Sequence, residues 1–138
     1  MEPYPLRMSP GEDLRRALEM AVAARACAAA FVIGGIGSLA VTRMRFAGAA
    51  EPFTLEGPLE ILTLVGTIAT NGSHLHMSVS DARGRVQGGH VASGCTVRTT
   101  AEVLLLLLRD WSFSRERDSA TGYGELMVRA KGPGPDPP

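Results

Sequence analysis

The chain has 138 residues, of which 45% are hydrophobic and 20% are charged, a composition typical of a soluble globular domain with a core of its own. Lys and Arg together number 14, as do Asp and Glu, so the formal net charge is zero. This balance argues against strong non-specific binding to nucleic acid, which depends on the neutralisation of phosphates.

The N-terminal segment predicts a strand followed by a helix. Residues 4–8 (YPLRM) are apolar enough for an edge strand. A capping box of the form S-x-x-E begins at Ser9, and a proline follows it at a position that suits the first helical turn. The apolar residues that then recur at helical spacing are Leu14, Leu18, Ala21 and Val22. We therefore expect a long helix from about residue 10 to about residue 25.

The next segments predict strands interrupted by glycine. We expect strands at residues 29–33 and 37–46, then a short strand, a turn at Gly57-Pro58, and a long strand from residue 59 to about residue 69. The glycine cluster at residues 34–37 has no Lys-Ser/Thr after it and leads into a strand, so it is not a phosphate loop. A bend or bulge is the expected role of these glycines.

The C-terminal part of the domain contains a leucine run in EVLLLLLRDWSFSRERD, residues 102–118. The run is compatible with a helix or a strand; the strands before it, with Val103 and Trp111, favour one long strand buried on both faces. GYGELMVRA predicts a last strand, and residues 131–138 predict a disordered tail. We expect a single α+β domain over residues 1–130: a mostly antiparallel sheet with one long N-terminal helix packed on it.

All three histidines lie in one predicted hairpin, residues 71–91. Asn71-Gly72 is a strong hairpin signal, and SHLHMSVSD alternates as a strand does. In the turn D-A-R-G, the positions of Asp81 and Gly84 predict a type I turn with a G1 bulge. The Arg-Gly-Arg triplet here matches the core of an AT-hook, but no proline follows it and the turn itself needs Gly84, so we interpret the triplet as a turn.

The register of this hairpin places His76 opposite His90, and His74 lies two residues along the same face. Three neutral imidazoles converging on one patch suit zinc and leave a coordination position open. A polar sheet face with hydrogen-bonded histidines is the alternative. The residues alone leave both interpretations open.

The cysteines and the apolar segments bear on location. Cys27 and Cys95 are far apart and form no C-x-x-C motif, so we expect two buried thiols and no disulfide framework. No signal peptide is evident, and the apolar stretch ACAAAFVIGGIGSLAV is too short for a bilayer. These features predict a cytoplasmic protein with no membrane partner.

Several short segments resemble, in order and spacing, the PPC (plants and prokaryotes conserved) domain family, the domain attached to AT-hooks in plant proteins. The resemblance covers residues 4–129, and its segments are LRMSPGEDL, IGGIGSLAVTRMRF, GPLEILTLVGTI, HLHMSVSDARGRVQGGHV, TTAEVLLL and TGYGEL. The resemblance implies a stand-alone prokaryotic member of the family, with a compact α+β domain that forms homotrimers. It also implies metal binding through His74, His76 and His90. Members of the family are often described as DNA-binding. Glu60 also matches a family position. It is expected either to support a metal-binding histidine from behind or to contact another subunit of the trimer, with an ion pair to Arg43 as the alternative.

Three functions remain as hypotheses. We favour a non-enzymatic homotrimeric binding and regulatory module that carries a metal or small ligand at the histidines and acts through transcription-related protein partners. The alternative is a metal-dependent enzyme of unknown substrate, with Glu60 or Asp81 as its base. The third is direct DNA binding, for which the candidate contacts are Arg43, Arg45, Arg98, Arg115 and Arg117.

Overall fold

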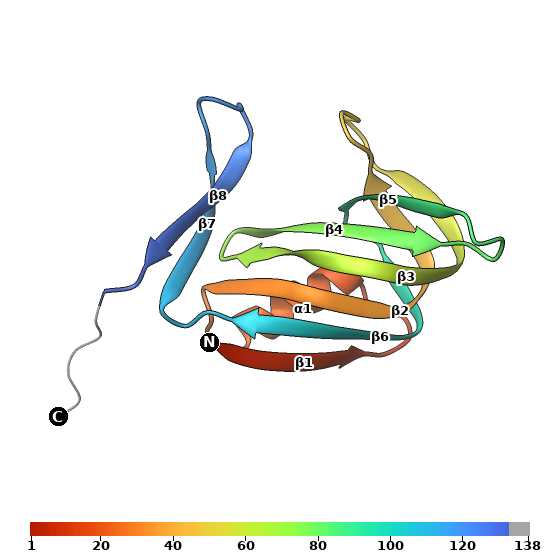
Figure 1. Ribbon diagram of the computed structural model, residues 1–138, viewed down its shortest axis with the longest axis horizontal. Helices are drawn as coiled ribbons and strands as arrows, with labels where there is room; N and C mark the ends of the chain where they lie inside the picture. The colour runs from red at the N-terminus through yellow and green to blue at the C-terminus, as the bar shows by residue number, and fades with distance from the viewer. Residues whose placement is uncertain (133–138) are drawn as a thin grey trace.

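The structure is a computed structural model, and it describes residues 1–132. In chain order the elements are β1 (Glu2–Met8), α1 (Leu14–Ala23), β2 (Ala29–Arg45), β3 (Phe53–Ala69), β4 (Gly72–Ser80), β5 (Val86–Val91), β6 (Thr96–Leu107), β7 (Trp111–Arg117) and β8 (Gly124–Ala130). Six strands form an antiparallel sheet in the order β1-β6-β2-β3-β4-β5, and β7 pairs with β8 in a separate hairpin. Helix α1 covers one face of the large sheet, and the β7–β8 hairpin stands at one end of it (Figure 1). The predicted α+β class is confirmed; most of the predicted tail lies outside the described residues.

Helix α1 is short, where the sequence predicted a long helix. It spans Leu14–Ala23 and is capped by the side chain of Asp13. The capping box predicted at Ser9 is a separate turn, because Gly11 has φ of 87° and donates its N–H to the carbonyl of Val97. Pairing with the start of β6 thus removes the first predicted turn from the helix. Nowhere in residues 1–132 does a helix reach the length and hydropathy that a membrane span requires.

Strands β2 and β3 are continuous where the sequence predicted interruptions. The glycine cluster at residues 34–37 lies inside β2, and the register against β6 shifts there, which is the bulge that the glycines predicted. Gly57 and Pro58 lie inside β3 and form no turn. A Cβ atom at Gly57 would meet the carbonyl oxygen of Leu39, so this close approach of the two strands requires glycine.

The core lies between the large sheet and α1. Leu14, Leu18 and Val22 of the helix pack into it, at the spacing that the sequence predicted. The leucine run does not form one long strand buried on both faces: β6 ends, the chain turns, and β7 follows. Within β6, Leu105 is fully buried whereas Leu104 is 41% exposed. One chain therefore covers only one face of this apolar strand.

Phe113 is the buried side chain by which the β7–β8 hairpin packs on the sheet. This side chain is 2% exposed, and its ring meets that of Phe31 edge to face at 5.6 Å. Its backbone N–H donates to the carbonyl of Ala28, and its carbonyl accepts from the N–H of Thr70. These contacts place β7 beside the turn that joins β3 to β4.

Candidate metal centre

The β4–β5 hairpin has the predicted register. His76 pairs with His90, and the remaining pairs run in step to Ser80 opposite Val86. Gly84 has φ of 76° and donates to the carbonyl of Asp81, as a bulged type I turn requires. The opposite face is core, as predicted: its buried side chains are Leu75, Met77, Val79 and Val91.

The turn at the other end of β4 differs in detail from the prediction. Ala69 pairs with Gly72, so the two residues of the tight turn are Thr70 and Asn71 rather than Asn71 and Gly72. The Asn71 side chain is used elsewhere. Its amide nitrogen donates to the carbonyl of Arg115 at 2.9 Å, and its amide oxygen accepts from the N–H of Arg115 at 2.7 Å. Asn71 therefore binds β7 as a neighbouring strand would.

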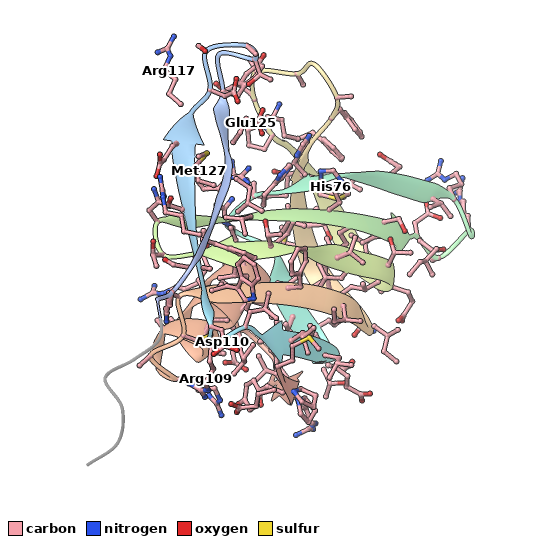
Figure 2. All side chains as sticks on the ribbon, turned by 60° about the vertical axis from the view of Figure 1, so that its left-hand side comes forward. His76, Arg109, Asp110, Arg117, Glu125 and Met127 are labelled. Atoms are coloured by element: carbon pink, nitrogen blue, oxygen red, sulfur yellow. The ribbon has the colours of Figure 1, made fainter. Side chains whose placement is uncertain are left out.

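The three imidazoles meet on the outer face of this hairpin. His74 Nε2 lies 3.0 Å from His90 Nδ1 and 3.1 Å from His76 Nε2. One candidate ligand atom from each ring lies within 4.8 Å of the other two. Figure 2 shows His76 in the same upper part of the molecule as Glu125 of the β7–β8 hairpin. The convergence that the register predicted is present.

Burial is the first cause that lowers the pKa of His74 below its ordinary value. The charges of Arg115 and of the other two histidines lower this pKa further, and Glu125 opposes them. The pKa of His90 is also lowered, by burial first and then by His76 and Arg45. Both shifts favour neutral imidazole, which is the form that binds metals.

The donor set fits a metal ion better than it fits a hydrogen-bond network. His74 Nε2 faces two ring nitrogens at hydrogen-bonding distance, yet an imidazole nitrogen has either one lone pair or one proton. A metal ion would take one lone pair from each ring. Nitrogens bound tetrahedrally to one zinc ion lie about 3.3 Å apart, given Zn–N bonds of 2.0–2.1 Å, so two of the three pairs need little movement.

A pocket of about 200 Å³ adjoins the histidines. Its lining includes His74 and His90 together with three arginines, Arg15, Arg45 and Arg115. Arg45 lies directly opposite His90, because the end of β2 pairs with β5 as well as with β3. Arg45 and Arg115 were considered as DNA contacts from the sequence, and the structure instead places them beside the histidines.

The other predicted site residues are not at the histidines within one chain. Glu60 pairs with Ser80, four residues along β4 from His76, which is about 13 Å on a strand. Arg43 donates to the carbonyl of Ser93, and the ion pairs of the described residues include none between Arg43 and Glu60. A trimer contact by Glu60 stays a prediction.

The carboxylate of Asp81 is occupied at its own turn. It accepts from the N–H groups of Arg83 and Arg85 and from the Arg85 guanidinium. The side-chain hydrogen bond of Arg85 is the first cause that holds the pKa of Asp81 below its ordinary value. Asp81 therefore shapes the hairpin and is not placed to act as a base at His76.

Two features of the site were missed from the sequence. Arg15 comes from α1 and reaches β4 and β5, where it donates to the carbonyls of Ser73 and Val91. Asn71 was assigned only to a turn, although it also positions Arg115. No local pattern indicates either contact, since each joins residues more than 40 positions apart.

Comparison with known proteins identifies close relatives of this fold. The chain is 44% identical over 125 residues to a bifunctional protein GlmU from Synechococcus sp. (strain JA-3-3Ab); the match covers 91% of this chain and 20% of that protein, so the chain spans about a fifth of its length. A hypothetical protein from Salmonella cholerae-suis is 38% identical in sequence, with a TM-score of 0.91 over 94% of both chains.

Two further structures carry descriptions of what they bind. A metal-containing protein from Archaeoglobus fulgidus has a TM-score of 0.74 and 28% identity, over 92% of this chain and 94% of its own. A protein from Bacteroides thetaiotaomicron, described as a "putative DNA binding protein", has a TM-score of 0.79 at 19% identity, over 94% of this chain and 93% of its own, and shows the fold alone. The sequence profile of the Plants and Prokaryotes Conserved (PCC) domain matches residues 1–109. The chain therefore belongs to this family, the one that its sequence segments resemble.

Proposed function

We propose that this chain is a non-enzymatic binding and regulatory module that holds a divalent transition metal ion, best matched by zinc, at His74, His76 and His90. The observation that carries the proposal is the placement of one imidazole nitrogen from each residue within 4.8 Å of the others. The metal-containing relative from Archaeoglobus fulgidus supports it. A cytoplasmic location belongs to the same proposal, because both cysteines are free and buried.

The histidines would hold the ion and leave at least one coordination position for a ligand. The bound ion would supply a localised positive charge and Lewis acidity beside the pocket. The rigid β4–β5 hairpin would fix the orientation of the rings, because its buried face is anchored in the core.

The test is metal analysis of untagged protein. We expect about one zinc ion per chain after dialysis, and tight zinc binding in competition with a chromogenic chelator. The variants His76→Gln and His90→Gln should each bind zinc at least about tenfold more weakly, because two ligands form a much poorer site. Ser80→Ala is the matched control, since Ser80 lies on the same face of β4 some four residues away. Wild-type protein that neither retains nor takes up zinc would rule the proposal out.

The homotrimer is also a proposal, and the exposed face of the sheet supports it. Large apolar side chains are exposed on the central strands β2, β3 and β6; they are Phe31, Ile33, Ile36, Leu62, Val65 and Leu104. An open hollow of about 600 Å³ lies among β1, β2 and β6 on this face. Contiguous apolar surface of this kind marks protein interfaces, and a second copy of the chain would cover it.

Light scattering coupled to size exclusion tests self-association. We expect the wild-type protein to have about three times the chain mass of 14.6 kDa. Leu104→Asp places a charge on the exposed apolar face and should lower the mass to that of one chain, because a buried unpaired charge opposes association. Met20→Asp is the control, since Met20 is 58% exposed on α1. A wild-type monomer at micromolar concentrations would refute self-association.

The enzymatic alternative rests on one observation, the pocket that adjoins a three-ligand site. DNA or transcription-related proteins as partners rest on the family resemblance and on relatives such as the Bacteroides protein. The zero net charge and the use of Gly84 in a turn favour protein partners over direct DNA contact. Nanomolar binding to duplex DNA with a steep dependence on salt would reverse that preference.

A further inference from the structure

The pocket beside the histidines has an unusual charged lining. Three arginines line it, from three separate elements: Arg15 on α1, Arg45 on β2 and Arg115 on β7. Its lining contains no aspartate or glutamate. Guanidinium groups repel one another, and an anion bound between them would remove this repulsion. The grouping of three arginines therefore indicates an anion-binding pocket.

The three guanidinium groups differ in how they are paired. Arg15 is neutralised, because Nε binds Glu19 at 3.0 Å and both terminal nitrogens donate to backbone carbonyls. Among the described residues, the Arg45 guanidinium donates only to the carbonyl of Ala49, at 3.0 Å. The Arg115 guanidinium makes no hydrogen bond and no ion pair with any part of the chain that the structure describes. Within residues 1–132, the positive charges of Arg45 and Arg115 therefore have no carboxylate partner.

Besides Glu19, which pairs with Arg15, a second acidic residue acts on this region. Glu125, on β8, partly offsets the effect of Arg115 on His74. Its Oε1 accepts from the hydroxyl of Thr121 on its own hairpin, and it forms none of the ion pairs of residues 1–132. Glu19 and Glu125 both lie outside the pocket lining, and two carboxylates against three arginines leave the lining positive.

The fold holds both unpaired arginines at the histidines. The Asn71 side chain binds both the N–H and the carbonyl of Arg115, and these two bonds fix the position of the Arg115 backbone. Arg45 is held by strand pairing opposite His90. Both arginines line the pocket together with His74 and His90. The positive charges are thus built into the fold and are not free ends of surface side chains.

We propose that this pocket binds a small oxyanion, a carboxylate or a phosphate, between Arg45 and Arg115 and next to the ion at the three histidines. The contact of the oxyanion with the metal ion rests on the proposed metal site. Its contacts with Arg45 and Arg115 do not depend on that site. Guanidinium groups bind such oxyanions through paired, charge-assisted hydrogen bonds. A volume of about 200 Å³ equals about six or seven water-sized groups, given about 30 Å³ for each. That size suits phosphate or a short dicarboxylate.

The test is calorimetric titration of the full chain with inorganic phosphate and with malonate, once on zinc-loaded and once on metal-free protein. We expect saturable binding of at least one anion, tighter when zinc is present. Arg115→Gln should weaken it about tenfold to a hundredfold, the effect of losing a charge-assisted hydrogen bond. The anion affinity of Arg115→Lys should lie between those of the wild type and Arg115→Gln, because lysine keeps the charge but cannot form the paired hydrogen bonds.

The controls separate the pocket from the metal site. Arg117→Gln should bind the anions as the wild type does, since Arg117 lies further along the hairpin and away from His76 (Figure 2). Arg115→Gln should still bind zinc in chelator competition, because Arg115 is not a ligand. Arg45→Gln provides a second variant if Arg115→Gln fails to fold.

The outcomes distinguish the two proposals. Binding of phosphate alone, or of malonate alone, identifies the class of ligand. Binding of neither anion by either form, or equal binding by wild type and Arg115→Gln, overturns the oxyanion site. If the chain does not bind zinc but its metal-free form binds an anion through Arg115, the proposed metal function fails and the oxyanion site stands.

Discussion

The β7–β8 hairpin should leave the sheet at a lower urea concentration when Phe113 is replaced by alanine. Phe113 is 2% exposed and is the side chain that joins the hairpin to β2 through the edge of Phe31. Loss of a buried phenylalanine costs about 3–5 kcal/mol, of which an edge-to-face pair accounts for about 0.5–1.5 kcal/mol. We take about 3 kcal/mol, because the neighbours of a hairpin at the end of a sheet can relax. With an m-value of about 2 kcal/mol/M, the urea midpoint should fall by about 1.5 M.

Trp111 provides the assay, because it is the one tryptophan of the chain and lies on β7. We expect its fluorescence transition to move to lower urea in Phe113→Ala, ahead of the circular-dichroism transition of the large sheet. Val128→Ala is the control: Val128 faces Phe113 on β8 but is 51% exposed, so its loss should change stability by less than about 0.5 kcal/mol. A Trp111 transition that moves by less than about 0.5 M in Phe113→Ala would refute the role of Phe113 as the anchor.

Two further predictions concern ionisable groups. Because the folded chain lowers the pKa of His74 and of His90 below 6.5, the unfolded chain binds more protons as the pH falls through that value. The stability that the neutral histidines contribute to the metal-free protein should therefore be complete above about pH 6.5 and be lost below it. The double variant His74→Gln/His90→Gln should show a flatter stability profile between about pH 5 and 7, and an unchanged slope would contradict the shifts. Asp13→Ala should lower the free energy of unfolding in urea by about 2–3 kcal/mol, since Asp13 accepts from the N–H of Arg16 to cap α1 and also from the N–H of Gly94. Asp13→Asn should recover part of this loss. A loss below about 0.5 kcal/mol in Asp13→Ala would contradict the contribution of both bonds.

The histidine hairpin was predictable because its determinants are local. The alternation of β4 fixes which side chains face the core, and the turn from Asp81 to Gly84 sets the register of β5. Register then places His76 opposite His90, with no need for distant contacts. Strand geometry alone thus brought the three imidazoles together on one face.

The start of α1 was predicted wrongly because distant segments compete for the same backbone. Ser9 begins a real turn, yet Gly11 donates to Val97, some 86 positions away, and the helix begins only after Asp13. The continuity of β3 through Gly57 has a similar cause, since its close approach to Leu39 gives the segment a strand partner. Local propensity cannot weigh contacts of this kind.

The sequence by itself determined the α+β class, the family and the hairpin that carries the histidines, because each follows from patterns within a few residues or from segments in a specific order. Only the tertiary structure decided where the arginines lie. Arg15, Arg45 and Arg115 come from a helix and two strands that are distant in sequence, and they meet at the histidines because β2 also pairs with β5 and because Asn71 binds β7. The lining of a pocket is set by such long-range packing, so the spacing of residues along the chain does not predict it.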